Sequence, residues 1–389
     1  MTEQRQLIAW RILALVAVAL ALATLYTFAR SQQLPSHEGP SYRIAYTRDL
    51  EGMFHIVHCG ADGLDCRELA ASDGTDLMPS AAPPSAEVSD EPRIAFLRID
   101  TQDAESRDTG PFAPGGVYVL GLNSGQTGKV SAQVDRIMTV RPSWSPDGRQ
   151  IAFGGAEDLN ADGAYALDES GVYVSDVNSG EVRRVATGLL AGWQLSWSPA
   201  GDLLLATGIE AGDSVPYVYA LEIGSGITYT HPYIGEITTA CWSPEGDHIA
   251  AYSREDHRIH VLDSQGDEAF AFDAPYGDVL EIIWTPGAAP DASDEQLFAV
   301  TGTGFELGAG PLYRRHVSAS AGEHWIPVAG AQSFTALLSA SPDGRYVAFT
   351  RFSSEHEGDL FVLDRADREP RQITSDPGFE GAATWVSVP

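Results

Sequence analysis

The sequence predicts an all-β fold, a seven-bladed β-propeller of four-stranded blades preceded by one N-terminal transmembrane helix. The following observations predict it. Beyond residue 41 there is no long helical pattern, and a short phrase centred on Trp-Ser-Pro recurs in a β-rich sequence. The two ends of this repeat region each carry part of one further repeat. Ahead of it stands an apolar segment long enough to cross a bilayer.

The N-terminal segment is interpreted as a signal anchor. Residues 1–30 would be a cytoplasmic stub and a transmembrane helix, with the uncharged stretch Ile12 to Ala29 as the span. Arg5 and Arg11 precede this stretch, and the positive-inside rule keeps that side in the cytoplasm.

The orientation of this anchor sets the expected location. Residues 31–40 would be a linker, and residues 41–389 a propeller on the outer side of the cytoplasmic membrane, periplasmic or extracellular. The alternative is secretion after cleavage, because Ala21-Leu22-Ala23 matches a signal peptidase site.

The repeat is clearest at Pro142–Gly148, which reads PSWSPDG. Further copies lie at Trp197–Gly201, Trp242–Gly246, Trp284–Pro286 and Ala340–Gly344, with a worn copy at Pro79–Pro83. After the copy at Trp144, the runs Ile151–Phe153, Val172–Asp176 and Arg184–Ala186 predict three more strands. One repeat is therefore expected to form one blade of strands a, b, c and d.

These repeats resemble the TolB-type, WD-repeat-like propeller family, and the resemblance covers nearly everything from Ser41 to the end. The resemblance implies a ring of blades around a central channel. Seven blades would depart from the six usual in TolB. The α/β domain that precedes the propeller in TolB has no counterpart here, so the partners of TolB are not implied.

The ends of the chain are expected to complete one blade together. Ala382–Val386 matches an a strand, whereas Tyr42–Tyr46, Phe54–Val57 and Arg67–Leu69 match b, c and d. Pairing of the strand around Trp385 with the strand around Ile44 would close the ring and remove two exposed strand edges. The repeated tryptophans are expected to pack between blades rather than to bind carbohydrate.

The loops between strands b and c vary most in length, so the face that carries the b-c and d-a loops is predicted to bind a partner. Trp193, Tyr233 and Tyr276 are the aromatic residues expected on this face. The partner would be an unidentified protein or cell-envelope component. Nucleic acid is not expected, because a chain with a net charge of −30 repels phosphate backbones.

A possible calcium loop lies between two predicted strands. Asp158, Asn160 and Asp162 alternate ahead of Gly163, and Glu169 stands at the twelfth position, which matches D-x-[DN]-x-[DN]-G-x5-E. Calcium takes oxygen ligands, and the carbonyl of Ala164 would complete the set. An ordinary acidic loop is the alternative, since no helices are expected to flank it.

Cys59 and Cys66 flank Ala61-Asp62-Gly63-Leu64. An Asp-Gly turn would place the two cysteines opposite each other in a hairpin, within disulfide range. The alternative is two free thiols.

The leading functional hypothesis is a membrane-anchored, non-enzymatic binding scaffold, because no G-x-S-x-G, H-E-x-x-H or phosphate-loop motif occurs. The alternatives are a glycan-active hydrolase or lyase that uses the central channel, and a sensor of calcium or a small solute. Carboxylates and histidines that converge on the channel would favour an enzyme, whereas a face rimmed by aromatic residues would favour binding.

Overall fold

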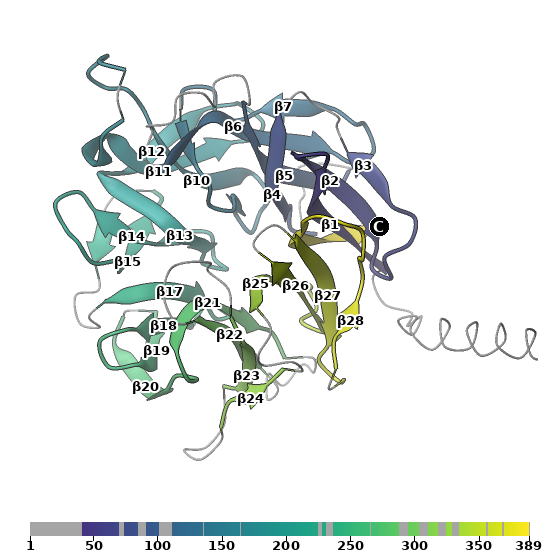
Figure 1. Cartoon of the computed structure of the whole chain (residues 1–389). Helices are drawn as coiled ribbons and strands as arrows, with labels where there is room; N and C mark the ends of the chain where they lie inside the picture. The colour runs from purple at the N-terminus through teal and green to yellow at the C-terminus, as the bar shows by residue number, and fades with distance from the viewer. Residues whose placement is uncertain are drawn as a thin grey trace, which may run out of the picture. The chain divides into compact units, whose positions relative to one another are not determined.

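Short β-strands arranged as sheets around a common centre make up the domain in the computed structural model (Figure 1). The structure describes residues 41–388 except 70–73, 85–90, 101–110, 135, 164, 225–227, 231–235, 265, 288–294, 303–309, 318–323, 329–333, 355–356 and 368. Successive strands are antiparallel and joined by tight turns, as the alternation of β-branched residues with Gly, Asp and Asn predicts.

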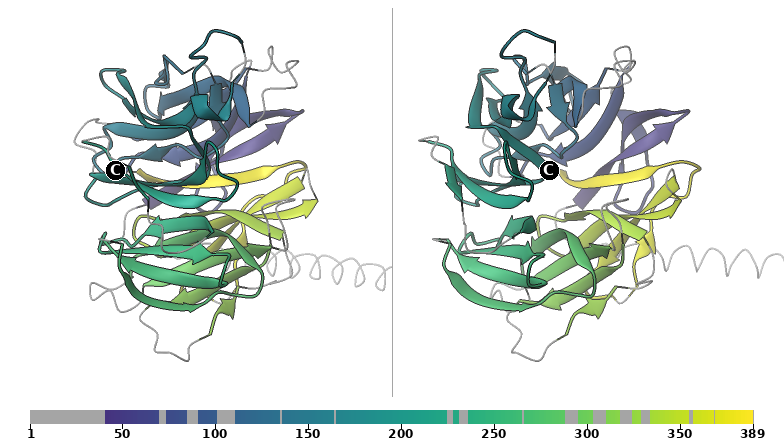
Figure 2. Two further views of the ribbon diagram at one scale, coloured as in Figure 1. Left: turned by 90° about the vertical axis from the view of Figure 1, so that its left-hand side faces the viewer. Right: turned by 60° about the vertical axis from the view of Figure 1, so that its left-hand side comes forward.

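The first sheet joins the two ends of the domain, in the order β29 (Glu380–Val388), β1 (Ser41–Leu50), β2 (Met53–Gly60) and β3 (Arg67–Leu69). Residue Ile44 of β1 lies opposite Trp385 of β29. The two strands run side by side (Figure 2). The predicted closure of the ring by the terminal strands is therefore confirmed.

Four more sheets have four strands each. Two of them are β13 (Leu189–Trp197), β14 (Leu203–Glu210), β15 (Tyr217–Glu222) and β16 (Thr228–Thr230), and β17 (Ile237–Trp242), β18 (His248–Ser253), β19 (Arg258–Asp263) and β20 (Glu268–Asp273). The other two are β21 (Asp278–Thr285), β22 (Gln296–Gly302), β23 (Leu312–His316) and β24 (Ile326–Pro327), and β25 (Phe334–Ala340), β26 (Tyr346–Ser354), β27 (Glu357–Asp364) and β28 (Arg371–Gln372).

The remaining strands form one sheet of nine strands. They are β4 (Thr75–Ala81), β5 (Arg93–Ile99), β6 (Phe112–Gly121), β7 (Thr127–Lys129), β8 (Arg136–Met138), β9 (Ser143–Trp144), β10 (Gln150–Ala156), β11 (Ser170–Asp176) and β12 (Val182–Thr187). A 3-10 turn, η2 (Leu167–Glu169), precedes β11.

The prediction of seven separate four-stranded blades is therefore wrong, because the described part of the chain has five such blades and one larger sheet. The cause is β8, in which Ile137 pairs with Ala113 of β6 on one side and Gly155 of β10 on the other. A Cβ atom on Gly155 would lie 2.7 Å from the carbonyl oxygen of Arg136. Glycine at this position lets β8 approach β10 closely enough to join the sheets.

The predicted transmembrane anchor and the membrane location derived from it are corrected as well. Among the residues that the structure describes, none lies in a helix long and apolar enough to cross a membrane. The segment Ile12 to Ala29 and the proposed linker at 31–40 lie outside the described residues. Apolar length alone predicted the span, and no described helix supports it.

The tryptophans of the repeated phrase pack between neighbouring sheets, as predicted. The indole N–H groups of Trp144, Trp197 and Trp385 donate to the backbone carbonyls of Ser80, Ser143 and Ser339, each in the preceding inner strand. All three indoles are buried. These three repeats therefore each contact the neighbouring sheet through one hydrogen bond and one apolar ring.

Bulges interrupt the inner strands at equivalent places, a few residues ahead of the tryptophan position. The register shifts lie between Leu77 and Ser80, Leu190 and Gln194, Ile237 and Thr239, Val279 and Glu281, and Ala336 and Ser339. Met78 and Leu337 adopt left-handed backbone angles there, with φ of 54° and 61°. A bulge frees backbone N–H groups from the ladder, and these groups become available at the centre of the ring.

Candidate functional site

A hollow lies at the centre of the described part of the chain, where the bulged inner strands meet. Its volume is about 440 Å³. Residues from β4, β13, β17, β21 and β25 line it, together with the segment between β8 and β9. Most of the wall is apolar or neutral, so the charged residues that reach it stand out: Arg141, Arg254, Asp278 and Glu281.

Glu281 enters the cavity at the bulge of β21, and its carboxylate binds the bulge of the next inner strand. Oε2 accepts a hydrogen bond of 2.8 Å from the N–H of Leu337, and Oε1 accepts one of 2.9 Å from the N–H of Leu338. The left-handed angle at Leu337 is compatible with this arrangement, because it turns two successive N–H groups toward one carboxylate. Glu281 thus holds two inner strands together.

Arg141 approaches the same strand from the segment between β8 and β9. Its Nη1 donates to the carbonyl of Leu338 at 3.2 Å. Its Nη2 is buried and has no hydrogen-bond partner among the described residues. A buried guanidinium nitrogen without an acceptor is costly, so this position favours an acceptor supplied by a ligand or by water.

Burial dominates the electrostatics of this pair. Burial raises the pKa of Glu281, while Arg141 and the two amides of Leu337 and Leu338 act in the opposite direction. Burial also lowers the pKa of Arg141, although Glu281 partly offsets this effect. An arginine remains charged at neutral pH in spite of such a shift. Glu281 and Arg141 therefore each favour the charged form of the other, and Nη2 of Arg141 still has no hydrogen-bond partner among the described residues.

A second group of charges at the cavity wall is already paired. Arg254 donates from Nη2 to Asp278 at 2.9 Å and from Nη1 to Glu236 at 2.9 Å. The hydroxyl of Tyr252 donates to the other oxygen of Asp278 at 3.1 Å. Hydrogen bonds to Asp278 and Glu236 raise the pKa of Arg254, and burial raises the pKa of Tyr252. This group stabilises the wall and leaves Arg141 as the available cation.

The composition of the wall limits the chemistry it can perform. Among the described residues that line the cavity there is no histidine, cysteine or lysine. Its serine and threonine hydroxyls therefore have no base of these kinds beside them, and both carboxylates have fixed partners. The arrangement suits the binding of an anion better than proton transfer.

The structure places the predicted calcium loop on the connection from β10 to η2. Asp158 accepts hydrogen bonds from the N–H groups of Asp162 and Gly163, and Asn160 also accepts from Asp162. Glu169 is buried and accepts from the N–H of Leu159 at 3.1 Å. These oxygens bind the amides of their own loop.

Within the described residues, no three His, Cys, Asp or Glu side chains come together in a way that could hold a metal ion. Ala164 lies outside the described residues. Calcium binding therefore stays a prediction.

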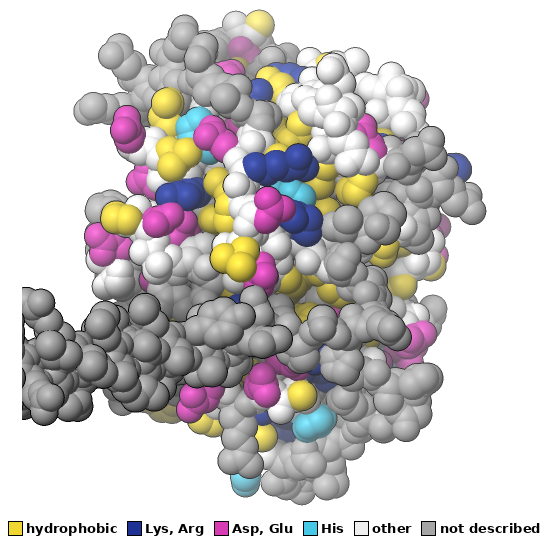
Figure 3. All heavy atoms as spheres, turned by 90° about the vertical axis from the view of Figure 1, so that its right-hand side faces the viewer, with side chains coloured by type: hydrophobic (Ala, Val, Ile, Leu, Met, Phe, Trp, Pro, Cys, Tyr) yellow, Lys and Arg dark blue, Asp and Glu magenta, His cyan; other side chains and the backbone are white. Residues whose placement is uncertain are grey.

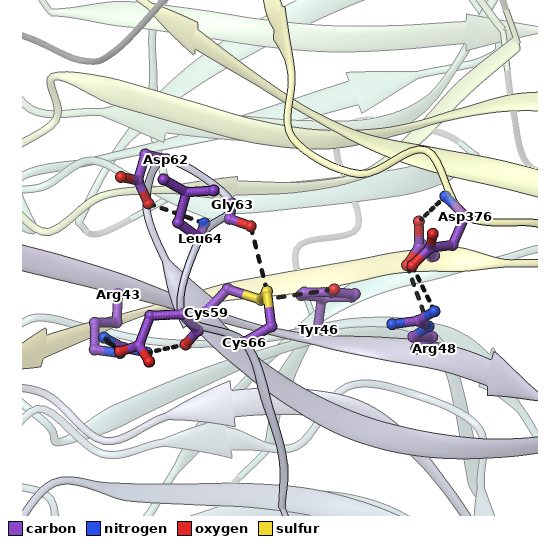
Figure 4. The surroundings of a disulfide bond; sticks show 11 residues. Arg43, Tyr46, Arg48, Cys59, Asp62, Gly63, Leu64, Cys66 and Asp376 are labelled. Atoms are coloured by element: carbon purple, nitrogen blue, oxygen red, sulfur yellow. Dashed lines mark hydrogen bonds and ion pairs between the residues drawn. A yellow bond between two sulfur atoms is a disulfide. The ribbon is translucent and has the colours of Figure 1, made fainter. Parts of the chain in front are cut away.

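The predicted disulfide between Cys59 and Cys66 is confirmed. Their Cα atoms lie 4.1 Å apart at the turn from β2 to β3. The hydroxyl oxygen of Tyr46 lies 3.7 Å from Sγ of Cys59, on the buried side of the hairpin (Figure 4). The third cysteine, Cys241, is buried and free in the inner strand β17.

Of the predicted aromatic binding face, only Tyr276 can be placed. It stands between β20 and β21 with 90% of its surface exposed. The side chain of Trp193 and all of Tyr233 lie outside the described residues. The binding face on the b-c and d-a loops therefore stays a prediction.

The sequence analysis missed Arg141 and Glu281. Glu281 offers a signal, because it is the one charged residue in the apolar run Val279–Trp284. A carboxylate in the inner strand of a repeat has to find partners inside the ring. Arg141 gives a weaker signal in the sequence, since it directly precedes the repeated phrase in a segment that resembles a turn.

Comparison with known proteins supports the fold. No protein family profile and no curated protein sequence matches the chain. Among solved structures, TolB from Acinetobacter baumannii is similar, with a TM-score of 0.51 and 15% identity over 88% of this chain and 66% of that one. The likeness supports a propeller fold, whereas the finer TolB-type label is not confirmed.

Two structures named as enzymes are similar as well. The periplasmic gluconolactonase of Pseudomonas aeruginosa has a TM-score of 0.55 and 16% identity over 90% of this chain and 99% of that one. A puromycin hydrolase has a TM-score of 0.58 and 14% identity over 89% of this chain and 56% of that one. The chain thus spans just under two thirds of the TolB structure and about half of the hydrolase. At these identities the likeness shows a propeller and not an activity.

Proposed function

We propose that this protein is a non-enzymatic binding protein whose propeller holds a small organic carboxylate in the central cavity. The observation that carries the proposal is the buried Nη2 of Arg141, which has no partner among the described residues and belongs to a residue of the cavity wall. A carboxylate oxygen is a natural acceptor for this nitrogen, because guanidinium and carboxylate form charge-assisted hydrogen bonds.

The size and lining of the cavity support a small ligand. A volume of about 440 Å³ falls within the usual range for such sites. Leu195, Leu280 and Ile283 contribute apolar wall, and Gln194 adds a side-chain amide. A compact acid with a partly apolar body would satisfy both parts of this lining.

The fixed carboxylates support binding rather than catalysis. Glu281 is held by two backbone amides, and Asp278 is held by Arg254 and Tyr252. A general base has to exchange a proton with the substrate and is best left with a free lone pair toward it. These groups instead pre-organise the site around Arg141.

Isothermal titration of the full chain with small carboxylates tests the proposal, with gluconate and benzoate as probes and glucose and benzyl alcohol as their uncharged controls. Arg141→Gln should weaken the binding of the tightest carboxylate by tenfold or more, because a hydrogen bond to a charged group contributes about 1.5–3 kcal/mol. Arg149→Gln is the matched control, since Arg149 is exposed in the turn ahead of β10.

Equal affinities of the Arg141→Gln and Arg149→Gln proteins would contradict a role for Arg141. Circular dichroism of each variant establishes that it is folded. If Arg141→Gln does not fold, Arg141→Lys keeps the charge but not the planar fork, and it should still weaken binding.

A sugar-lactone hydrolase is the second candidate, favoured by the likeness to a gluconolactonase along nearly its whole chain. It predicts turnover of gluconolactone above the spontaneous rate, which a pH-stat measures directly. Turnover that is lost in Arg141→Gln would replace the binding proposal with this one.

A further inference from the structure

A second hollow lies away from the central cavity, on the sheet that closes the ring. Its volume is about 280 Å³, and Arg43 of β1, His58 of β2 and Arg67 of β3 line it. Basic side chains gather beside histidine on the face of the molecule to which this sheet belongs (Figure 3). Two arginines in one small pocket are unusual here, because the whole chain has 24 basic residues against 54 acidic ones.

Strand register brings these three side chains to one face of the sheet. His58 pairs with Arg67 across the β2–β3 ladder and with Ala45 across the β1–β2 ladder. Arg43 precedes Ala45 by two residues, so both point to the same face. Three neighbouring strands therefore contribute one nitrogen-bearing side chain each.

The partners of the two arginines leave the pocket positively charged. Arg43 donates to the carboxylate of Asp65 at 3.0 Å and to its carbonyl at 2.7 Å. Arg67 donates one hydrogen bond of 3.3 Å, to the carbonyl of Leu122. Asp65 is the one acidic residue among those that line the pocket, so with a neutral His58 the lining still has a net positive charge.

His58 is the feature that points to a ligand. It is 3% exposed, and neither ring nitrogen has a hydrogen-bond partner among the described residues. Burial, then Arg43 and Arg67, lowers the pKa of His58 to about 4, with Asp65 acting weakly in the opposite direction. A buried imidazole with two unsatisfied nitrogens costs stability, and an anion in the pocket would remove part of that cost.

We propose that this pocket binds the phosphate group of a small molecule, with Arg43, His58 and Arg67 as its donors. Three donors on three strands match the several oxygens of a tetrahedral oxyanion better than the two oxygens of a planar carboxylate. A pocket of about 280 Å³ also leaves room for the organic part of a phosphate ester. This site is independent of the function proposed for the central cavity.

The disulfide holds two of the donors in place. Cys59 directly follows His58, and Cys66 directly precedes Arg67, so the bond closes the hairpin beside the pocket. Arg43 lies next to this hairpin (Figure 4). The disulfide thus stabilises the pairing of His58 with Arg67, and its reduction should weaken the site without removing any donor.

Isothermal titration of the full chain with inorganic phosphate and with glycerol 3-phosphate tests the proposal, with acetate as the planar anion. Both phosphates should bind more tightly than acetate. Tighter binding of the ester would identify a phosphorylated metabolite as the ligand, and equal binding would identify the free ion. Phosphate affinity no higher than acetate affinity would overturn the proposal.

Arg67→Gln removes one donor from an exposed residue, so the fold should tolerate it. It should weaken phosphate binding by about tenfold, the effect of one hydrogen bond to a charged group. Arg183→Gln is a matched control, because Arg183 on β12 is also exposed and also donates to a carbonyl of the neighbouring sheet, that of Ile223 at 2.8 Å. Equal phosphate affinities of the two variants would contradict the assignment.

A pH series with sulfate, whose charge is constant over this range, examines His58. An anion beside the ring favours its protonated form, so sulfate affinity should rise as the pH falls from about 7.5 to about 5.5. The rise should be absent in His58→Gln. A sulfate affinity that is independent of pH in the unmodified protein would exclude His58 as a donor. If His58→Gln does not fold, the comparison of Arg67→Gln with Arg183→Gln still tests the site.

Discussion

Closure of the ring depends on Trp385, and replacing this residue measures what closure contributes. Its indole is 4% exposed and donates to the carbonyl of Ser339 at 3.0 Å. The ring also contacts Tyr42 of β1 and Tyr346 of β26, with centroids 6.1 Å and 5.7 Å away. One side chain therefore links the terminal strand, the first strand and the neighbouring sheet.

The expected magnitude follows from these contacts. Trp385→Ala removes the ring and leaves a cavity, which should lower the free energy of unfolding by about 3–5 kcal/mol. Against a total stability of about 5–15 kcal/mol, this is a large fraction. Trp385→Phe keeps most of the apolar contact but loses the hydrogen bond. Its cost in unfolding free energy should exceed by about 1 kcal/mol that of a Trp→Phe change where the indole makes no hydrogen bond.

Trp242 provides the matched control. Trp242 occupies the same place in its repeat and is 6% exposed, but its Nε1 has no partner among the described residues. Urea unfolding followed by far-ultraviolet circular dichroism compares Trp385→Phe with Trp242→Phe. Equal losses would refute the role of the Ser339 hydrogen bond, and a loss below about 1 kcal/mol for Trp385→Ala would refute closure through this residue.

Three more outcomes are expected from the described residues. Cys66→Ser opens a short closed loop and should lower the free energy of unfolding by about 2–3 kcal/mol, as measured by urea unfolding. An unchanged free energy would mean that the disulfide does not constrain the unfolded chain. Since the pKa of His58 is about 4 in the folded protein and about 6.5 in the unfolded chain, stability should be full above about pH 6.5 and decrease as the pH falls toward 4. In His58→Gln, the urea midpoint should no longer show the decrease that His58 causes at low pH. Millimolar calcium should raise the melting temperature of the unmodified protein but not of Asp158→Ala, and equal calorimetric responses would make the loop motif a coincidence.

The features that the sequence predicts correctly are those recorded in contiguous residues. The Trp-Ser-Pro phrase predicts the packing of the tryptophans, and the two partial repeats predict that β29 pairs with β1. The Asp62-Gly63 turn likewise predicts the disulfide. The tryptophan packing and the disulfide follow from local patterns, whereas the pairing of β29 with β1 follows from counting which strands each partial repeat lacks.

The features that sequence reasoning misses depend on contacts between distant segments. The joining of two sheets through β8 depends on Gly155, which looks like an ordinary strand residue until another backbone lies against it. Arg141 and Glu281 come from different repeats, and both bind the backbone of a third at the bulge of Leu337 and Leu338. A bulge shifts the alternation of a strand by one residue, and a single break in so short a strand does not show from the sequence which distant backbone amides it exposes.

The net negative charge of the chain affects anion binding at both proposed sites. With a net charge of −30, the surface repels anions at long range. An anion is then best held where arginines gather in a hollow, because a lower local dielectric strengthens their attraction. Arg141 is buried at the central cavity, and Arg43 and Arg67 both line the hollow on the closing sheet. The same charge suppresses nonspecific binding of anions elsewhere on the surface, so discrimination between anions depends on the donors and the size of each hollow.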